Sequence, residues 1–463
     1  MRPLKQRCGP LAWGLAIALL FGAVATPATG RVVAVVIDDS ASMNSGSRWP
    51  FTVHLLQLTA AVLNEHEDRL FVRRLSEHIS EKSDLRQDVL LAGMARQYAI
   101  EGFAGWDARS GTPYFAVEQA ISDLIRETKA GEEAVLLILT DGGFSTGTFP
   151  GSSTHSSLAE LIEHFEGRRR QFHGSNLQVT FVAVAPSRSE LAMIEQQQLR
   201  AALLIAFNQN PYDGDIRIDS IKPQEAYRQA VEVLARVLGS NAQADKFYRI
   251  EEAAVALSPP PGSSEIVLIV PGHAAWPPPS ISPAPLQAGQ PLQYDAGMGG
   301  LLRARVTHWP IERAPAAEAP LIVKFEASLP HPDRAFVLIR RPLQLEVELW
   351  VDNHRIEPNP ATGAYLLSGD EPVELRVYLA DVRLGIARRS EMATAPDRPD
   401  FRVDYRFHGS ARCQSSRFLG TPDGHYVTRT LLLDKPGEHF LSIKASHIGL
   451  FELRAADLRI FVW

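Results

Sequence analysis

The chain of 463 residues contains only two cysteines, Cys8 and Cys413. Two cysteines cannot build a disulfide framework or a cysteine-ligated zinc or iron–sulfur centre. The chain also lacks an excess of positive charge, because 47 lysine and arginine residues face 53 aspartate and glutamate residues, for a formal net charge of -6. A protein that binds nucleic acid through its phosphates needs a basic surface. The composition therefore argues against a nucleic-acid partner.

One long apolar run stands at the N-terminus. A basic head precedes the apolar stretch 11–25, and Ala23-Val24-Ala25 supplies the small residues that a signal peptidase needs. We therefore expect residues 1–25 to be a signal peptide and the protein to be exported, either periplasmic or secreted. The stretch of about 15 residues is shorter than the roughly 20 that span a bilayer as a helix. The alternative is an uncleaved segment, extended to Ala28, that anchors the protein in the membrane.

Residues 31–240 alternate short apolar runs with stretches of helical periodicity. This alternation is typical of a doubly wound, Rossmann-like α/β domain, in which helices cover both faces of a mainly parallel sheet. Runs of β-branched and long aliphatic residues favour strands that are buried on both faces. The expected strands are Val32–Ile37, Leu70–Leu75, Ala134–Leu139, Val179–Val184 and Ile216–Ile218. The expected helices are Thr52–Asn64, Leu85–Tyr98, Tyr114–Thr128 and Pro223–Leu238.

The second half of the chain has a different composition. Proline-rich segments over 258–291 exclude helices and suit turns, extended linkers and edge strands. Further on, residues 344–349 and 374–378 alternate apolar and charged side chains, as in antiparallel sheets with one buried face. We expect an all-β half that consists of two Ig-like, sandwich-type domains, 241–329 and 330–463.

Oxygen-bearing side chains gather where two of the expected strands end. Asp38, Ser40 and Ser42 follow the first strand, and Asp141 follows the third. Thr112 lies between them in the chain, in a tight turn before a helix. Ligands bind at the carboxyl ends of the strands in doubly wound sheets. We therefore expect these five oxygen donors, from three loops, to form one site for a hard divalent cation.

The donor types indicate the class of metal. Two carboxylates and three hydroxyls, without imidazole or thiolate, suit Mg²⁺, Mn²⁺ or Ca²⁺ rather than zinc or copper. If the hydroxyls bind the ion directly and the carboxylates act through water, little negative charge touches the ion. Such an ion stays electrophilic and accepts a carboxylate from another molecule. The alternative is a metal that only holds the loops together, with no ligand from a partner.

At these positions the sequence resembles the von Willebrand factor type A (vWA) domain family. Asp38-x-Ser40-x-Ser42 is similar to the first metal motif of that family. Thr112 and Asp141, the latter in Thr-Asp-Gly, are similar to the second and third motifs. The resemblance covers the α/β half only. It implies a metal-ion-dependent adhesion site, in which the three hydroxyls ligate the ion directly, the two carboxylates act largely through waters, and a Glu or Asp of a partner completes the coordination.

Other residues near these motifs allow a structural or a functional interpretation. We expect Asp39 to be a solvated turn residue rather than a ligand. We expect Arg168-Arg169-Arg170 to be a solvated helix end, where cations favour the helix dipole. Aromatic residues that flank the motifs form either a rim around a bound partner or ordinary packing; they are Trp49, Trp106, Tyr114, Phe144 and Phe149.

Two motifs look catalytic but lack the required context. Gly143-Phe144-Ser145-Thr146-Gly147 matches the nucleophile elbow, which needs a helix directly after the serine. No helix is expected there before about Ser157. His66-Glu67 lacks the second histidine of the zinc-protease motif, because residue 70 is leucine. The sequence therefore indicates a protein that is not an enzyme.

Together these observations favour an exported adhesion-type protein that captures an acidic residue of a protein partner through a divalent cation. The cation is Mg²⁺, or else Mn²⁺ or Ca²⁺. The alternative is a glycan-binding or envelope-structural protein that acts through its β domains, with the α/β domain in a regulatory role. This alternative is based on the aromatic residues Trp309, Trp350, Tyr365 and Trp463, for which core packing is the competing interpretation. The sequence leaves the partner and the oligomeric state open.

Overall fold

The computed structural model describes segments of both halves of the chain. In the first half they are 30–63, 68–75, 115–129, 132–142, 158–172, 176–195, 198–207, 215–218 and 223–237. In the second half they are 242–249, 254–257, 265–271, 279–282, 292–298, 302–310, 321–325, 334–340, 343–359, 362–369, 371–381, 401–407, 414–416, 419–420, 425–427, 433, 435–447, 451–454 and 458–463. The expected signal peptide 1–25 and the expected helix Leu85–Tyr98 lie outside these segments.

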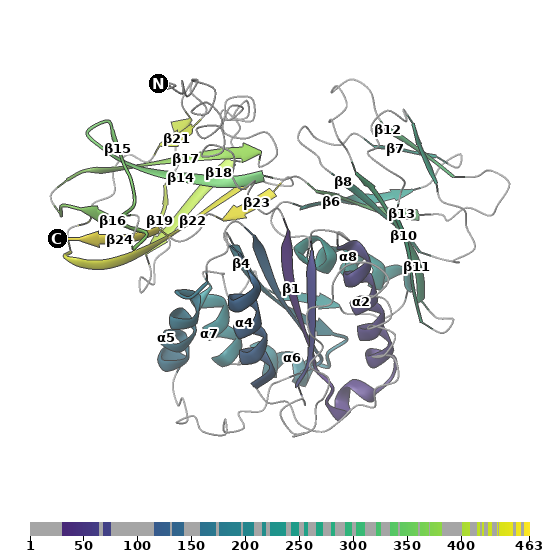
Figure 1. The fold of residues 1–463 in the computed structure, drawn as a ribbon. Helices are drawn as coiled ribbons and strands as arrows, with labels where there is room; N and C mark the ends of the chain where they lie inside the picture. Colours follow the sequence, from purple (N-terminus) through teal and green to yellow (C-terminus); the bar gives the residue numbers. More distant parts are fainter. Residues whose placement is uncertain are drawn as a thin grey trace, which may run out of the picture.

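A five-stranded parallel sheet with the order β2-β1-β3-β4-β5 forms the centre of the first half (Figure 1). Its strands are β1 (Arg31–Ile37), β2 (Arg69–Arg74), β3 (Glu133–Thr140), β4 (Asn176–Val184) and β5 (Asp215–Ile218). All pairings in this sheet are parallel. Strand β1 is an interior strand, and every one of its residues is buried. The expected strands are confirmed to within three residues at each end.

Helices cover both faces of this sheet. Helices α2 (Arg48–Val62) and α8 (Pro223–Val237) pack on one face. Helices α4 (Phe115–Glu127), α5 (Leu158–Arg169) and α7 (Gln198–Ala206) pack on the other. The short helices η1 (Ala41–Asn44) and α6 (Arg188–Glu195) follow β1 and β4 at the carboxyl edge. The expected doubly wound α/β fold is confirmed.

The described part of the second half contains strands and no helix. The strands up to residue 340 are β6 (Ala242–Arg249), β7 (Ala254–Leu257), β8 (Glu265–Pro271), β9 (Ser280–Ser282), β10 (Leu292–Met298), β11 (Leu302–Pro310), β12 (Leu321–Lys324) and β13 (Arg334–Arg340). They form a five-stranded sheet, β10-β11-β8-β13-β6, and a three-stranded sheet, β7-β12-β9. Every pairing in both sheets is antiparallel.

The remaining strands form a second pair of sheets. They are β14 (Leu343–Val351), β15 (His354–Ile356), β16 (Ala364–Leu367), β17 (Val373–Asp381), β18 (Phe401–Phe407), β19 (Gln414–Ser416), β20 (Leu419–Gly420), β21 (His425–Val427), β22 (Gly437–His447), β23 (Phe451–Arg454) and β24 (Leu458–Val462). Their orders are β15-β14-β17-β21-β20 and β16-β24-β22-β18-β19, with β23 on β22. Only the pair β16–β24 is parallel among these described strands. The expected all-β half is confirmed, whereas its Ig-like type stays a prediction.

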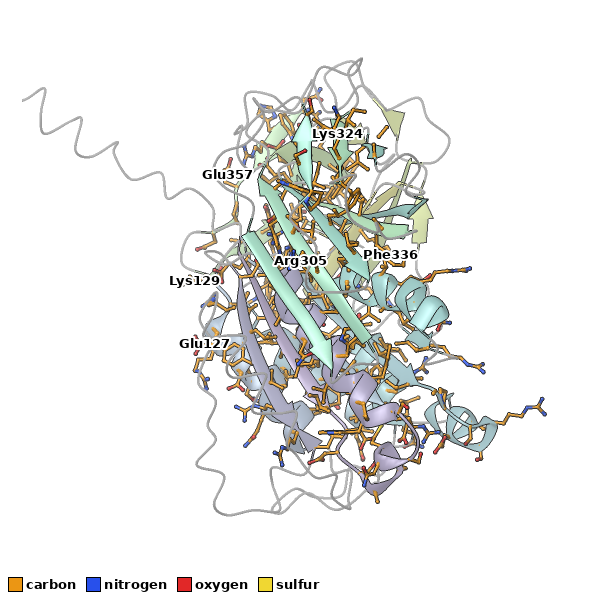
Figure 2. All side chains as sticks on the ribbon, turned by 90° about the vertical axis from the view of Figure 1, so that its right-hand side faces the viewer. Glu127, Lys129, Arg305, Lys324, Phe336 and Glu357 are labelled. Carbon is orange, nitrogen blue, oxygen red and sulfur yellow. The ribbon has the colours of Figure 1, made fainter. Side chains whose placement is uncertain are left out.

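Strand β8, in the middle of the sheet β10-β11-β8-β13-β6, is buried on both of its faces. Successive residues of a strand point to opposite faces, and in β8 Val267 and Ile269 pack toward α2 and α8. Ile266, Leu268 and Val270 pack instead toward the three-stranded sheet. The first half and this sheet therefore share one apolar core. Figure 2 views this sheet from the right-hand side of Figure 1, with Arg305 on β11 and Phe336 on β13 labelled.

Helix α2 lies between the parallel sheet and this antiparallel sheet, and Figure 1 shows it beside β10 and β11. Twelve of its 15 residues are buried. The sequence pattern placed Val53, Leu56 and Ala60 on one apolar face. The structure also buries Leu55 and Leu58, with no exposed fraction at either. A helix that is apolar all round is stable only when it is covered on every side.

Buried charged groups join the two halves at the amino-terminal edge of the parallel sheet. Arg340 Nη1 donates to Glu265 Oε2 at 2.8 Å, and its Nη2 donates to Asp68 Oδ2 at 2.7 Å. His308 lies 2.7 Å from Glu265 Oε1 through Nδ1, and its Nε2 donates to the Ala61 carbonyl at 2.6 Å. Ala61 is in the last turn of α2, where carbonyls have no partner within the helix. The network therefore gives the Ala61 carbonyl at the end of α2 a hydrogen-bond donor. It also connects Asp68, directly before β2, with residues of β8, β11 and β13.

The last two sheets form a sandwich with a core of its own. Leu349, Leu375 and Val377 of one sheet pack against Leu441 and Ile443 of the other. Trp350 lies outside this core, where the Arg376 guanidinium stacks 3.7 Å from the centre of its ring. The sandwich thus buries its apolar faces against each other, as the alternating pattern predicted.

The basic end of α5 contacts this sandwich. Arg169 Nη2 donates to Ser442 Oγ at 2.7 Å, and its Nη1 donates to the Ala206 carbonyl at 2.8 Å. The Arg170 guanidinium lies 5.0 Å from the centre of the Phe440 ring. The expectation of a simple solvated helix end was therefore wrong for Arg169, which is a bridge between the halves. Sequence periodicity within α5 cannot predict a partner that is 273 residues away.

The strand pairing suggests a different division of the β half from the expected one. Strand β13 pairs with β6 and β8, so this sheet continues past residue 329 to Arg340. Strand β14 begins at Leu343 and belongs to the sandwich. We propose that the boundary lies between these two strands. None of the helices in the described segments combines the length and the apolar character of a membrane span.

The network at the junction predicts a large loss of stability for Arg340→Met. The substitution removes the guanidinium that binds the buried carboxylates of Asp68 and Glu265, and breaking a buried ion pair from one side costs about 3–5 kcal/mol. Arg459→Met is the matched control, because Arg459 forms an exposed pair with Glu438. An exposed pair contributes about 1 kcal/mol or less. Urea denaturation of both variants measures the difference, and equal midpoints would contradict the assigned role.

The same network predicts a contribution to acid sensitivity. Burial acts to raise the pKa of Glu265, but the Arg340 charge and His308 outweigh it and lower the pKa to about 2. A lowered pKa in the folded state gives stability that is present above the ordinary pKa of 4.5 and is lost as the pH falls toward 2. Glu265→Gln should therefore be less stable than the wild type at pH 7 and should approach it in this window. Parallel stability curves over pH 2–5 would contradict the prediction.

Candidate metal centre

The candidate centre lies at the carboxyl edge of the parallel sheet, where β1 and β3 end side by side. The backbone N–H of Asp38 donates to the Leu139 carbonyl at 2.8 Å, which extends the pairing of the two strands by one residue. Asp38 therefore follows β1 next to Thr140, the last residue of β3, and Asp141 follows directly. Asp38 and Asp141 each have an exposed fraction of 1%. Two carboxylates are thus placed in the interior of one sheet edge.

Four of the five predicted ligands are linked by short contacts. Ser42 Oγ donates to Asp141 Oδ1 at 3.0 Å, and Ser40 Oγ lies 2.9 Å from Ser42 Oγ. The Ser40 backbone N–H donates to Asp38 Oδ1 at 2.9 Å. The fifth predicted ligand, Thr112, lies outside the described residues. The structure therefore brings Asp38, Ser40, Ser42 and Asp141 together, with Ser42 exposed to solvent at the open side.

The spacing of these oxygens fits a small hard cation. Mg²⁺ binds oxygens at about 2.0–2.1 Å in an octahedron, so neighbouring ligands are about 2.8–3.0 Å apart. The contacts of 2.9 Å between Ser40 and Ser42 and 3.0 Å between Ser42 and Asp141 have this length. The hydroxyls and the carboxylate therefore lie close enough together to act as neighbouring ligands of one hard cation.

Burial makes the two carboxylates unfavourable as free anions. Burial raises the pKa of Asp38, against hydrogen bonds from Thr140 and Ser40 that act to lower it. Burial also raises the pKa of Asp141, and the negative charge of Asp38 raises it further. A divalent cation between them would offset both effects. The electrostatics of the site therefore favour a bound cation.

Sequence reasoning missed three residues that build the centre. Thr140 Oγ1 contacts Asp38 Oδ2 at 2.6 Å and accepts a hydrogen bond from the Gly142 backbone N–H at 3.2 Å. Arg48 donates to Asp141 Oδ2 at 2.5 Å and also binds Glu190. Thr140 stands next to Asp141 in the motif and could have been identified from the chain. Arg48 and Glu190 have no such signal, because 142 residues separate them.

Other predictions around the site have mixed outcomes. Asp39 was expected to be a solvated turn residue, and this is wrong because its exposed fraction is 0%. Trp49 belongs to the apolar core and is packing rather than a rim. The remaining rim candidates Trp106, Tyr114, Phe144 and Phe149 lie outside the described residues, as does the segment Gly143-Phe144-Ser145-Thr146-Gly147.

Among the described residues, no group of three or more His, Cys, Asp or Glu side chains could hold a metal ion. The candidate centre differs from such groups because two of its four described members are serine hydroxyls. Its donors are all oxygen atoms, which excludes the nitrogen and sulfur ligands that zinc and copper prefer.

No protein-family profile and no curated protein matches the chain. Solved structures that are similar to it include a von Willebrand factor type A protein from Catenulispora acidiphila, with 13% identity and a TM-score of 0.32 over 76% of this chain and 63% of that one. The open conformation of the pilus adhesin SpaC from Lactobacillus rhamnosus GG has 11% identity and a TM-score of 0.33 over 90% of this chain and 64% of that one. The manganese-loaded TRAP protein of Plasmodium vivax has 11% identity and a TM-score of 0.26 over 45% of this chain and 73% of that one.

The chain spans less than two thirds of the length of the first two of these structures. The α/β fold of the first half is therefore assigned from its own strand order and pairing. The class of protein that fold and site define is an α/β domain with an oxygen-lined carboxyl edge, joined to β-rich domains.

The geometry predicts that Ser42→Ala weakens Mg²⁺ binding at least about tenfold, which corresponds to about 1.4 kcal/mol. The substitution removes the hydroxyl that contacts both Ser40 and Asp141. Ser122→Ala is the matched control, because Ser122 Oγ donates within α4 to the Glu118 carbonyl, away from the site. Isothermal titration with MgCl₂ measures both affinities. Unchanged binding by Ser42→Ala would exclude this hydroxyl as a ligand.

Proposed function

We propose that this protein is an exported, non-enzymatic, adhesion-type protein with a vWA-type domain. Its divalent cation, Mg²⁺ or else Mn²⁺ or Ca²⁺, captures an acidic residue of a protein partner. The observation that carries the proposal is the chain of oxygens from Ser40 through Ser42 to Asp141, at the spacing of a magnesium coordination shell. Thr112 completes the proposed ligand set of Asp38, Ser40, Ser42, Thr112 and Asp141.

The nature of the ligands supports capture of a carboxylate. Hydroxyls carry no charge, so an ion held by Ser40 and Ser42 keeps most of its positive charge for a further ligand. A metal that only stabilised loops would be better held by charged ligands in direct contact. The exposed position of Ser42 leaves one side of the site open to a partner.

The position of the site in the molecule supports the same role. Arg31 and Asp38 stand at opposite ends of β1, seven residues apart, which is about 23 Å at 3.3 Å per residue. The junction with the β half is at the Arg31 end, where Arg31 N donates to Asp68 Oδ1 at 3.0 Å. The buried charged junction with the β half therefore lies at the edge of the sheet that is remote from the candidate centre, although the sheet β10-β11-β8-β13-β6 also packs along α2.

The proposal predicts that partner binding requires both the cation and the carboxylates. Protein with Mg²⁺, protein with EDTA and the variant Asp38→Ala/Asp141→Ala are each used to recover binding proteins from the same extract. We expect recovery only with Mg²⁺ and the intact site, while circular dichroism shows that the variant is folded. Substitution of the contacted Glu or Asp by Gln or Asn in a recovered partner should abolish binding. Equal recovery in EDTA would defeat the proposal.

A second candidate function rests on aromatic residues of the sandwich. Phe461 in β24 is 45% exposed, and Trp463, which follows the end of this strand, is 75% exposed. Leu366, which pairs with Phe461, is 51% exposed. Trp309, in contrast, is 1% exposed and belongs to a core. If the glycan-binding or envelope-structural alternative holds, Trp463→Ala abolishes binding and EDTA does not. The same recovery experiment therefore separates the two functions.

A further inference from the structure

Arg48 forms a clamp on the acidic side of the candidate centre. It is the first residue of α2, and its side chain has an exposed fraction of 13%. Nη1 donates to Asp141 Oδ2 at 2.5 Å, and Nη2 donates to Glu190 Oε2 at 2.9 Å. Nη2 also donates to the Ala185 carbonyl at 2.8 Å. One guanidinium thus connects the loops after β3 and β4 with the start of α2 and with α6.

The backbone at Ala185 shows that this contact is built into the fold. Ala185 has a φ of 44°, in the left-handed region that residues with a Cβ rarely adopt. Its N–H donates to the Ile218 carbonyl at 2.8 Å, which fixes the turn against β5. Such strained positions persist only where the surrounding structure holds them. Here the held carbonyl is the acceptor for Arg48.

The clamp determines which oxygen of Asp141 faces the ion. Oδ2 binds Arg48, and Oδ1 accepts the hydrogen bond from Ser42. Since a carboxylate is planar, fixing Oδ2 on the guanidinium also fixes Oδ1 beside the hydroxyl pair. Without Arg48 the carboxylate could rotate, and Oδ1 would no longer be held at 3.0 Å from Ser42 Oγ.

A guanidinium next to a cation site also repels the cation, and Glu190 offsets this. Both carboxylate oxygens of Glu190 face Arg48, at 3.2 Å and 2.9 Å. The Ser187 backbone N–H holds the same carboxylate at 2.5 Å.

We infer that Arg48 and Glu190 are a charge-balanced positioning pair for the divalent cation. Arg48 orients Asp141 toward the ion, and Glu190 cancels the repulsion that Arg48 would exert on it. This inference rests on the proposed function, since it assigns a role toward the proposed ion. Neither residue contacts the ion itself, so both are positioning residues rather than ligands.

Two variants separate the two roles. Glu190→Gln keeps Arg48 in place but leaves its charge unbalanced, so we expect Mg²⁺ affinity to fall about tenfold at an ionic strength of about 0.01 M and much less at about 1 M. Arg48→Gln/Glu190→Gln has the net charge of the wild type but no clamp. We expect its affinity to fall about tenfold at both ionic strengths. A merely structural role would not produce this difference in salt dependence.

The control is Arg69→Gln/Glu132→Gln, a pair at the opposite edge of the sheet with the same change in charge. We expect its Mg²⁺ affinity to equal that of the wild type. All variants are titrated with MgCl₂ by calorimetry after circular dichroism has shown that they are folded.

The outcomes distinguish this inference from the proposed function. If the wild type takes up no ion, the proposed function fails and the inference falls with it. If the wild type binds Mg²⁺ and Glu190→Gln binds it equally well at low ionic strength, only the balancing role is overturned. If the double variant binds as the wild type does, the positioning role is overturned and the proposed function stands.

Discussion

The burial of helix α2 between two sheets is the constraint on which most of the structure depends. Twelve of its 15 residues, distributed over every face, are buried, so the parallel sheet alone could not cover them. The antiparallel sheet of the β half supplies the second surface through residues such as Val306 and Leu338. At about 1.5 Å per residue the helix is about 22 Å long. It therefore reaches from Arg48 at the candidate centre to Ala61 at the junction, and the β half contributes to the position of the metal site's own scaffold.

The two ends of the parallel sheet solve the problem of buried charge in different ways. At the amino-terminal edge, Arg340 bridges the carboxylates of Asp68 and Glu265, and Arg31 is a second partner of Asp68, so these buried carboxylates have cationic partners within the protein. At the carboxyl edge Arg48 is shared between Asp141 and Glu190, and Asp38 is held by hydrogen bonds. The described acidic groups there exceed the described cations. This excess of negative charge at the carboxyl edge supports the proposal that a cation binds there.

Much of the fold could be predicted from the sequence, because the first half has apolar runs typical of a buried parallel sheet and the second half alternates apolar and charged residues. The proximity of Asp38, Ser40, Ser42 and Asp141 could also be predicted, because β1 and β3 are parallel and the residues that follow them lie at the same edge of the sheet. Contacts that depend on the tertiary fold could not. Helical periodicity predicted one apolar face of α2, but it did not predict that the antiparallel sheet covers the helix on its other side. It also predicted that the basic end of α5 is solvated, whereas Arg169 contacts the sandwich. Arg48 and Glu190 meet only because β4 and α6 place them together, and neither lies in a recognisable motif.

The direction of the strands gives the proposed adhesion role a mechanical basis. A pull on a ligand at the carboxyl edge would act along β1 toward its other end at Arg31. Strand β1 lies between β2 and β3 and pairs with each of them in parallel along its length. A force along the strands loads these backbone hydrogen bonds together, in shear, whereas a force across the sheet would break them one after another. Helix α2 runs between the same two regions and ends in the buried contact of Ala61 with His308. Load between the candidate centre and the β half would therefore be shared by a central strand and a largely buried helix, which suits the proposed adhesion role.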